Sequence, residues 1–158
     1  MTFTIDVFSE NDKQDCLALW DLANPWSKEN NRPDIPEANW QDVVSQQGPL
    51  YGLALRQASD GKLVGYILYF FCPSIRNVRD ECEIRDIFVL PEFRRQGGGT
   101  LLMKAVHEKA REHDAGRIFW AVNALREDSI AFMSTFGAEE KTERTYYLWL
   151  NTKVKAVA

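Results

Sequence analysis

The sequence predicts an α/β protein with a central mixed, mostly antiparallel twisted β-sheet flanked by about four α-helices. Three observations support this fold class. Apolar strand-like segments alternate with amphipathic helical segments along most of the chain. Residues 59–62 (Ser-Asp-Gly-Lys) separate two apolar segments, as the turn of a β-hairpin does. A buried strand ends in a glycine-rich loop and a helix within residues 86–100, and open α/β sheets usually bind ligands at such a strand end.

The first third of the chain predicts one strand and two helices. Residues Thr2–Phe8 alternate in the manner of a strand. Residues 9–12 (Ser-Glu-Asn-Asp) offer a capping box for a helix to about Leu22. Its inward side chains are Cys16, Leu17, Leu19 and Trp20. After a segment with three prolines, a second helix is predicted over Glu37–Gln47, with Trp40, Val43 and Val44 buried. The two helices form either a lid over a substrate or plain packing on the sheet.

The remaining elements complete the order β-α-α-β-β-β-α-β-α-β-β. Their predicted ranges are Tyr51–Arg56, Lys62–Phe71, Glu81–Leu90, Gly99–His113, Arg117–Val122, Asp128–Thr135, Ala138–Lys141 and Thr145–Leu150. In the fourth of these ranges apolar residues recur at helical spacing opposite a charged face, and residues 114–116 (Asp-Ala-Gly) end the helix. We expect one domain over residues 1–150 and a frayed tail over residues 151–158.

Composition narrows the class of protein. The 158 residues are 45% hydrophobic and carry a net charge of −4, which indicates a soluble globular protein and argues against nucleic acid as the main partner. No apolar run approaches the roughly 18 residues of a membrane span, and the first residues lack the basic region of a secretory signal. The three cysteines and two histidines have no metal-like spacing. We therefore expect no metal site, no membrane partner and reduced thiols in a cytoplasmic protein.

The glycine-rich loop predicts a site for a phosphate or pyrophosphate. Glycines let backbone N–H groups approach a ligand closely, and the following helix adds the positive end of its dipole. A P-loop would need a lysine between Gly99 and Thr100, and a dinucleotide-binding loop would need a third glycine in place of Leu102. Neither of those two motifs fits this chain.

The spacing Arg94-x-x-Gly97-x-Gly99 resembles the acetyl-CoA motif Q/R-x-x-G-x-G/A of the GNAT N-acetyltransferase superfamily. Residues 128–138 are similar to a second signature of that superfamily, a short helix that ends in a glycine turn, and the element order also agrees. Residues 64–71, followed by an acidic strand, look closest to the spermidine/spermine (diamine) and thialysine acetyltransferase branch. The resemblance covers nearly the whole chain. It implies a GNAT fold, acetyl-CoA as the acetyl donor and a small-molecule amine as the acceptor.

The resemblance also implies where the coenzyme binds. Its diphosphate is expected on backbone N–H groups of the loop, those of Arg95, Gln96, Gly97, Gly98, Gly99 and Thr100. The side chains of Arg94 and Arg95 are expected near a phosphate. The pantetheine arm is expected along Ile87, Phe88 and Val89, beside a bulge that opens the sheet, with a backbone N–H near Val89 polarising the acetyl carbonyl. Arg126 stands where many relatives carry an asparagine and is retained as a weak cofactor contact.

The catalytic positions depart from the pattern of the superfamily. Arg85 replaces the usual glutamate of the polyamine branch, and Met133 replaces the usual tyrosine acid. Glu83 should share the side of the strand on which Arg85 lies, so it is the first candidate for the base, and Asp86 is the second. Both carboxylates also fit ion pairs or a strand end. The leaving thiolate would take its proton from water or from another donor, and Cys72, Cys82, Tyr146 and Tyr147 are all too loosely placed to choose among them.

The sequence alone does not decide the acceptor substrate or the oligomeric state. A group of acidic residues near the strand favours a cationic polyamine as the acceptor. The group consists of Asp80, Glu81, Glu83 and Asp86. Arg85 works against a polyamine and favours an acceptor that carries a carboxylate, such as an amino acid. The alternatives to a small-molecule acetyltransferase are a non-catalytic acyl-CoA-binding sensor and a protein-lysine acetyltransferase. We expect a homodimer from the resemblance and from the aromatic segment Thr145–Leu150, although a buried strand of a monomer explains that segment equally well.

Overall fold

The computed structural model describes residues 2–24, 35–75, 79–121, 127–138 and 140. The chain forms two compact units, residues 1–121 and 122–158, and each is described by itself. The sheet and the glycine-rich loop belong to the first unit. The last two predicted strands, Ala138–Lys141 and Thr145–Leu150, fall largely or wholly outside the described residues, as does the predicted tail.

Five strands form one mixed sheet in the order β1-β2-β3-β4-β5. Their bounds are β1 Phe3–Val7, β2 Tyr51–Gln57, β3 Leu63–Cys72, β4 Glu81–Val89 and β5 Arg117–Trp120. The first four strands pair antiparallel with their neighbours, and β5 lies parallel to β4. The predicted mixed, mostly antiparallel sheet is therefore confirmed.

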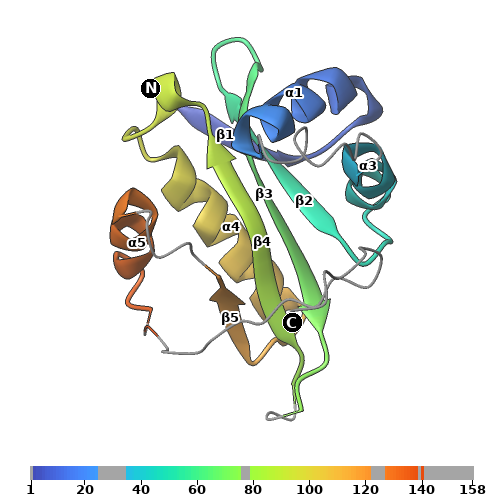
Figure 1. Cartoon of the computed structure of the whole chain (residues 1–158), viewed down its shortest axis with the longest axis vertical. Coiled ribbons are helices and arrows are strands. Elements are labelled where there is room, and N and C mark those ends of the chain that lie inside the picture. Colours follow the sequence, from blue (N-terminus) through green and yellow to red (C-terminus); the bar gives the residue numbers. More distant parts are fainter. Residues whose placement is uncertain (1, 25–34, 76–78, 122–126, 139, 141–158) are drawn as a thin grey trace, which may run out of the picture. The chain divides into compact units, whose positions relative to one another are not determined.

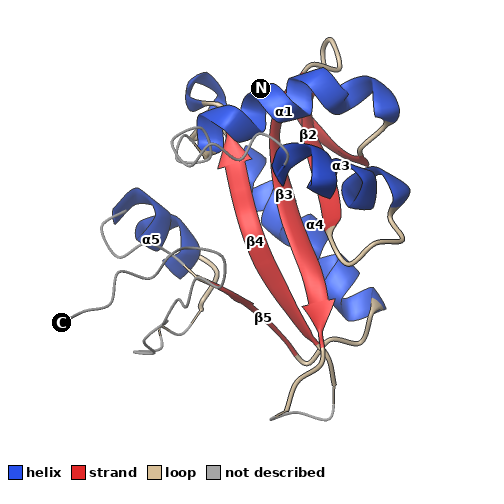
Figure 2. Ribbon diagram, turned by 45° about the vertical axis from the view of Figure 1, so that its right-hand side comes forward, coloured by secondary structure: helices blue, strands red, loops and turns tan. Residues whose placement is uncertain are grey.

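Helices cover both faces of this sheet, as Figures 1 and 2 show. Helices α1 (Lys13–Ala23) and α3 (Ile35–Ser45) lie on one face, the α1 face, and α4 (Gly98–Glu112) lies on the other, the α4 face. Helix α5 (Glu127–Ser134) belongs to the second unit. The core of the α1 face consists of Phe8, Cys16, Leu19, Trp40, Val43, Ala54, Leu63, Tyr66 and Leu68. Both α1 and α3 contribute to this core, which favours plain packing over a lid for these two helices.

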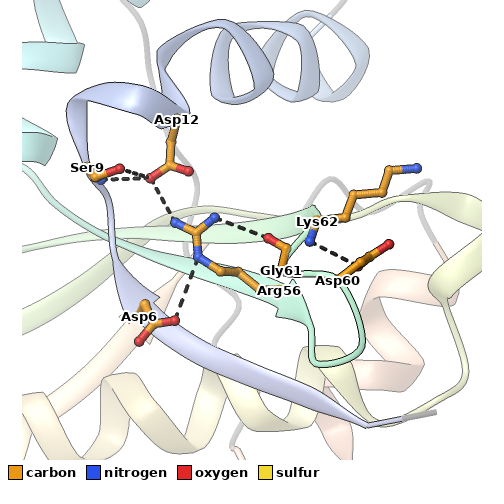
Figure 3. Close-up of polar contacts among 7 residues, drawn as sticks. All are labelled: Asp6, Ser9, Asp12, Arg56, Asp60, Gly61 and Lys62. Atoms are coloured by element: carbon orange, nitrogen blue, oxygen red, sulfur yellow. Dashed lines mark hydrogen bonds and ion pairs between the residues drawn. The ribbon is translucent and has the colours of Figure 1, made fainter.

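A buried ion pair joins the start of α1 to the hairpin of β2 and β3 (Figure 3). The Arg56 Nη2 donates to Asp12 Oδ2 at 2.7 Å. The Ser9 N–H donates to the same oxygen at 2.7 Å, which completes the predicted capping box. Burial tends to raise the pKa of Asp12, but the hydrogen bonds from Arg56 and Ser9 outweigh it, so the pKa falls below its ordinary value of 3.8. The ionised Asp12 therefore ties two separate parts of the chain together.

The bounds of α3 differ from the predicted ones for local reasons. The helix begins at Ile35 instead of Glu37, because Pro36 fits a first helical turn, where its missing N–H is not needed. It ends at Ser45, and the next residue, Gln46, takes a left-handed φ of 54° that no helix can continue.

Candidate functional site

The outer edge of β4 is unpaired along its second half. Strand β5 pairs with β4 only from Glu81 to Ile84, whereas β4 continues to Val89. In the described part of the chain, no strand lies beside residues 85–89 on that side. Such an edge presents backbone N–H and C=O groups to which an extended ligand can bind as an added strand. The predicted pantetheine contact requires an edge of this kind.

Strand β4 carries a bulge at Arg85. Leu68 of β3 pairs with Asp86, while the next residue of β3, Tyr69, pairs with Ile84. Arg85 is therefore an additional residue in β4 with no counterpart in β3. The predicted bulge is present, and it lies where the pairing between β4 and β5 ends.

The bulge brings Glu83, Arg85 and Asp86 to one face of the sheet. Directly paired residues share a face, so Asp86 lies on the α1 face with its partner Leu68. Successive residues of β3 alternate between faces. Phe70, two residues after Leu68, therefore lies on the α1 face together with its partner Glu83. Arg85 lies on this face too, because its Nη1 donates to Glu83 Oε1 at 3.0 Å. In a regular strand, Asp86 would face away from the other two.

The two charges of the Glu83–Arg85 pair differ in exposure. The Arg85 side chain is 66% exposed, whereas that of Glu83 is 19% exposed. The guanidinium thus reaches solvent while one of its nitrogens is fixed by the carboxylate. A cation therefore stands in the position where the sequence comparison expected a glutamate.

Asp86 is held by two side chains from other elements. The Tyr66 hydroxyl of β3 donates to Asp86 Oδ2 at 2.6 Å, and the Asn24 amide at the end of α1 donates to the same oxygen at 3.0 Å. Burial raises the pKa of the Tyr66 phenol well above its ordinary value of 10, and the Asp86 carboxylate raises it further. Tyr66 therefore stays protonated and acts as a donor to Asp86.

Two neighbouring glycines shape the loop between β4 and α4 for different reasons. Gly97, the residue before α4, has a φ of +89°, in the left-handed region that favours glycine. Gly98 is buried, and a Cβ on it would come 2.6 Å from Leu55 Cδ2. Helix α4 can therefore begin close against the sheet, with the N–H groups of its first turn at the loop. Residues 94–100 follow the open edge of β4 after one turn of 3-10 helix, Pro91–Phe93.

The hydrogen bonds of β4 show which backbone groups face the open edge. Leu90 N–H donates to Val64 O of β3 at 2.9 Å. Alternate residues of an antiparallel strand direct their N–H and C=O groups to opposite sides. The groups of Phe88 thus face β3, and those of Ile87 and Val89 face the open edge. This alternation favours Ile87 and Val89 over Phe88 as backbone partners for a ligand.

Arg94 lies against the end of β4. Its Nε donates to the Val89 carbonyl at 2.8 Å, and its guanidinium carbon lies 5.6 Å from the centre of the Phe88 ring. Arg95, by contrast, has a left-handed φ of 60° in an exposed part of the loop. Strand β4 therefore positions the side chain of Arg94.

The structure describes two of the four candidate proton donors, Cys72 and Cys82. Cys82 is buried and, because neighbouring residues of a strand face opposite sides, it lies on the same face as Ile84 and faces away from Glu83 and Asp86. Burial raises the pKa of its thiol to about 12. Burial is also the largest cause that raises the pKa of Cys72. Met133 lies on α5 in the second unit. The remaining candidates, Tyr146 and Tyr147, lie outside the described residues, as does the predicted cofactor contact Arg126.

Sequence inspection missed Tyr66 and Asn24. A signal for Tyr66 was present, because a buried tyrosine usually needs a hydrogen-bond partner for its hydroxyl and residues 63–71 read as a buried strand. For Asn24 no comparable signal exists, since its contact to Asp86 depends on where α1 ends over the sheet.

The part of the chain that the structure describes offers neither a metal site nor a membrane-spanning helix. No group of three or more His, Cys, Asp or Glu side chains is arranged to hold a metal ion. Within the same ranges, each helix is either too short or too polar to cross a membrane.

The chain belongs to the Acetyltransferase (GNAT) family, which it matches over residues 14–138. One relative is the thialysine N-epsilon-acetyltransferase of Sus scrofa, 35% identical over 81 residues that cover 51% of this chain and 47% of that protein. Another is the L-ornithine N5-acetyltransferase NATA1 of Arabidopsis thaliana, 31% identical over 81 residues that cover 51% of this chain and 36% of that protein. The matches thus span about half of this chain and half or less of these curated relatives.

A solved structure confirms the fold. AAC(6')-Iy in complex with the bisubstrate analog CoA-S-monomethyl-acetylneamine superposes with a TM-score of 0.77 at 19% identity. The superposition covers 94% of this chain and 98% of that one. The predicted GNAT fold is therefore confirmed.

Proposed function

We propose that this protein is an acetyl-CoA-dependent N-acetyltransferase that acetylates the primary amine of a small molecule, such as a polyamine, an amino acid or a related amine. The observation that carries the proposal is the bulged, half-open strand β4 followed by the glycine-rich loop and α4, in a chain of the GNAT family. The names of the relatives point the same way, because thialysine and ornithine are both small amines.

The coenzyme binds along β4 and the following loop. The N–H groups of residues 95–100 receive the diphosphate, where the start of α4 adds the positive end of its dipole. Arg94 and Arg95 add charge near the phosphates. The pantetheine arm pairs with the edge groups of Ile87 and with the N–H of Val89, whose carbonyl already accepts from Arg94, and this pairing places the thioester toward the bulge. This arrangement is supported by the unpaired edge of β4.

Acetyl transfer proceeds by direct attack on the thioester. The nitrogen of a neutral amine forms a bond to the acetyl carbon, the carbon–sulfur bond breaks, and the nitrogen loses one proton while the thiolate takes one up. Amines with a pKa near 10 are protonated at neutral pH, so a base must first accept a proton. Glu83 and Asp86 are the candidates, since both lie on the α1 face at the bulge. A backbone N–H near Val89 would polarise the acetyl carbonyl.

A non-catalytic acyl-CoA sensor is the second candidate function. Arg85 and Met133 favour it, because each stands where relatives carry a group that takes part in proton transfer. A sensor would bind acetyl-CoA through the same loop and strand but would transfer no acetyl group.

Release of coenzyme A thiol from acetyl-CoA separates the two functions. The protein is mixed with acetyl-CoA and a panel of primary amines that includes polyamines, amino acids and a lysine peptide, and free thiol is followed over time. An acetyltransferase releases thiol with at least one amine and not without amine. Calorimetric binding of acetyl-CoA combined with no release for any amine would identify a sensor instead, and release with the peptide alone would indicate a protein-lysine acetyltransferase.

We also propose a cytoplasmic homodimer. The three cysteines are all free, which agrees with a reducing compartment. The dimer is inferred from the family and from the aromatic segment Thr145–Leu150, which lies outside the described residues. Sedimentation equilibrium measures the mass directly, and a monomer mass at every concentration would contradict the dimer.

A further inference from the structure

We propose that Arg85 selects acceptor amines that carry a carboxylate a few bonds from the amine, and that it disfavours plain polyamines. This inference rests on the proposed function and specifies its substrate class. It starts from the bulge, which brings Arg85 and Asp86 together on the α1 face although they are consecutive in a strand. A cation and an anion therefore stand next to each other where the open edge of β4 begins.

Arg85 is oriented for recognition of a carboxylate. Its Nη1 is held by Glu83 at 3.0 Å, and its side chain remains 66% exposed. A guanidinium presents several N–H donors in one plane, and this fork matches the two oxygens of a carboxylate. Because Glu83 fixes one end of the group, less conformational freedom is lost when a ligand binds.

Asp86 supplies the complementary charge. Tyr66 and Asn24 hold one of its oxygens, so the carboxylate has a fixed position close to the bulge. An ammonium group is attracted to Asp86, and a carboxylate on the same molecule is attracted to Arg85. A polyamine has no carboxylate to offer to the guanidinium, so its second ammonium group gains no contact with Arg85. The two side chains together match an amino acid better than a diamine.

Matched acceptor pairs test this inference. Each pair consists of an amino acid and the amine that lacks only its carboxylate: L-ornithine with 1,4-diaminobutane, L-lysine with 1,5-diaminopentane, and L-leucine with 3-methylbutylamine. We expect wild-type protein to prefer the amino acid in kcat/KM by roughly 10- to 100-fold, as for a hydrogen bond between charged groups. Arg85→Met should abolish this preference, mainly through a higher KM for the amino acid. Arg85→Lys, which keeps the charge but not the planar fork, should retain part of it.

Arg79→Met is the matched control. Arg79 is also an exposed arginine paired with a carboxylate, since its side chain is 60% exposed and its Nη1 lies 3.2 Å from Asp114 Oδ1. It does not lie on β4, so its loss should leave the preference unchanged. If Arg85→Met lowers kcat/KM equally for both members of each pair, or if wild-type protein prefers the diamines, the inference is wrong while the proposed function stands.

Binding calorimetry decides the inference even without turnover. The same pairs are titrated into protein saturated with coenzyme A. Tighter binding of the amino acids that Arg85→Met removes supports the inference, even if no amine releases thiol and the proposed function fails. Equal binding of both members, or binding of neither, overturns it.

Discussion

Asp86 and Tyr66 form the best-defined polar contact of the candidate site. The hydroxyl and the carboxylate lie 2.6 Å apart, and the phenol is buried on the α1 face. Because burial and Asp86 together raise the pKa of Tyr66, the phenol remains a donor throughout the physiological range. At the scale of single residues, therefore, Tyr66 positions Asp86, one of the two carboxylates proposed as the base.

Tyr66→Phe tests this positioning role. Loss of the hydroxyl leaves Asp86 without one donor, so we expect the free energy of unfolding to fall by about 1–2 kcal/mol. We also expect a lower kcat for acetyl transfer and a changed pH profile, with coenzyme affinity unchanged. Tyr69→Phe is the control, because Tyr69 is a similarly buried tyrosine of β3 on the opposite face. Equal effects of the two substitutions on kcat and on its pH profile would show that Tyr66 is only structural.

Asp12→Asn tests the ion pair with Arg56. We expect it to lower the free energy of unfolding at neutral pH by about 2 kcal/mol, since Arg56 loses a buried charged partner. The folded pKa of Asp12 lies below its ordinary 3.8, so the stabilisation is present above that value. It is lost as the pH falls through the lower folded pKa. The difference between variant and wild type should therefore shrink below about pH 4.

Urea unfolding from about pH 7 to about pH 3 measures this difference. Glu108→Gln, which changes an exposed carboxylate near Arg111, is the control and should cost less than about 0.5 kcal/mol. A difference for Asp12→Asn that does not change with pH would contradict a role for the ionised carboxylate.

At the scale of elements, β4 and α4 carry the site because each departs from regular geometry at one place. The bulge at Arg85 changes which side chains share a face. The left-handed Gly97 and the closely packed Gly98 let α4 start at the end of β4. The bulge and the two glycines both lie next to the open edge of β4, to which the coenzyme binds in the proposed function.

Gly97→Ala tests whether the loop geometry is needed for coenzyme binding, and Gly61→Ala is the matched control. Gly97 and Gly61 both have positive φ, +89° and +74°, and a Cβ would meet open space at each. Alanine should therefore strain both backbones similarly, by about 1–2 kcal/mol. Only Gly97→Ala should weaken binding of coenzyme A, because Gly61 belongs to the β2–β3 turn. Calorimetric titration of coenzyme A measures this, and equal affinities of the two variants would argue against the loop as the diphosphate site.

The elements were largely predictable from the sequence because their signals are local. Alternation, helical spacing and the capping residues 9–12 depend on neighbours in the chain, and the observed strands and helices follow them closely. The pairing register is not local. The position of the bulge in β4 depends on how β4 aligns with β3. The meeting of Tyr66 and Asn24 at Asp86 depends in addition on where α1 ends. The sequence could therefore nominate Glu83, its neighbour Arg85 and Asp86, but not Tyr66 and Asn24, which hold Asp86.

At the scale of the whole molecule, the chain combines the fold of the GNAT family with unusual residues at two positions that we predict to be catalytic. The fold and the coenzyme motif agree with the GNAT family over residues 14–138. Within that frame, Arg85 and Met133 are the two positions at which we expect this chain to differ from the proton-transfer groups of its relatives. In the proposed reaction, the donor half therefore follows the family, and the acceptor half depends on residues particular to this chain.

Transfer of the acetyl group from acetyl-CoA to a small amine can be measured by mass spectrometry. The amine is analysed after incubation with acetyl-CoA and the protein, and the released thiol is measured in the same sample. We predict an amine that has gained one acetyl group, in equal molar amount to the free coenzyme A. Thiol release without acetylated amine, or no change in any amine despite coenzyme binding, would contradict the claim.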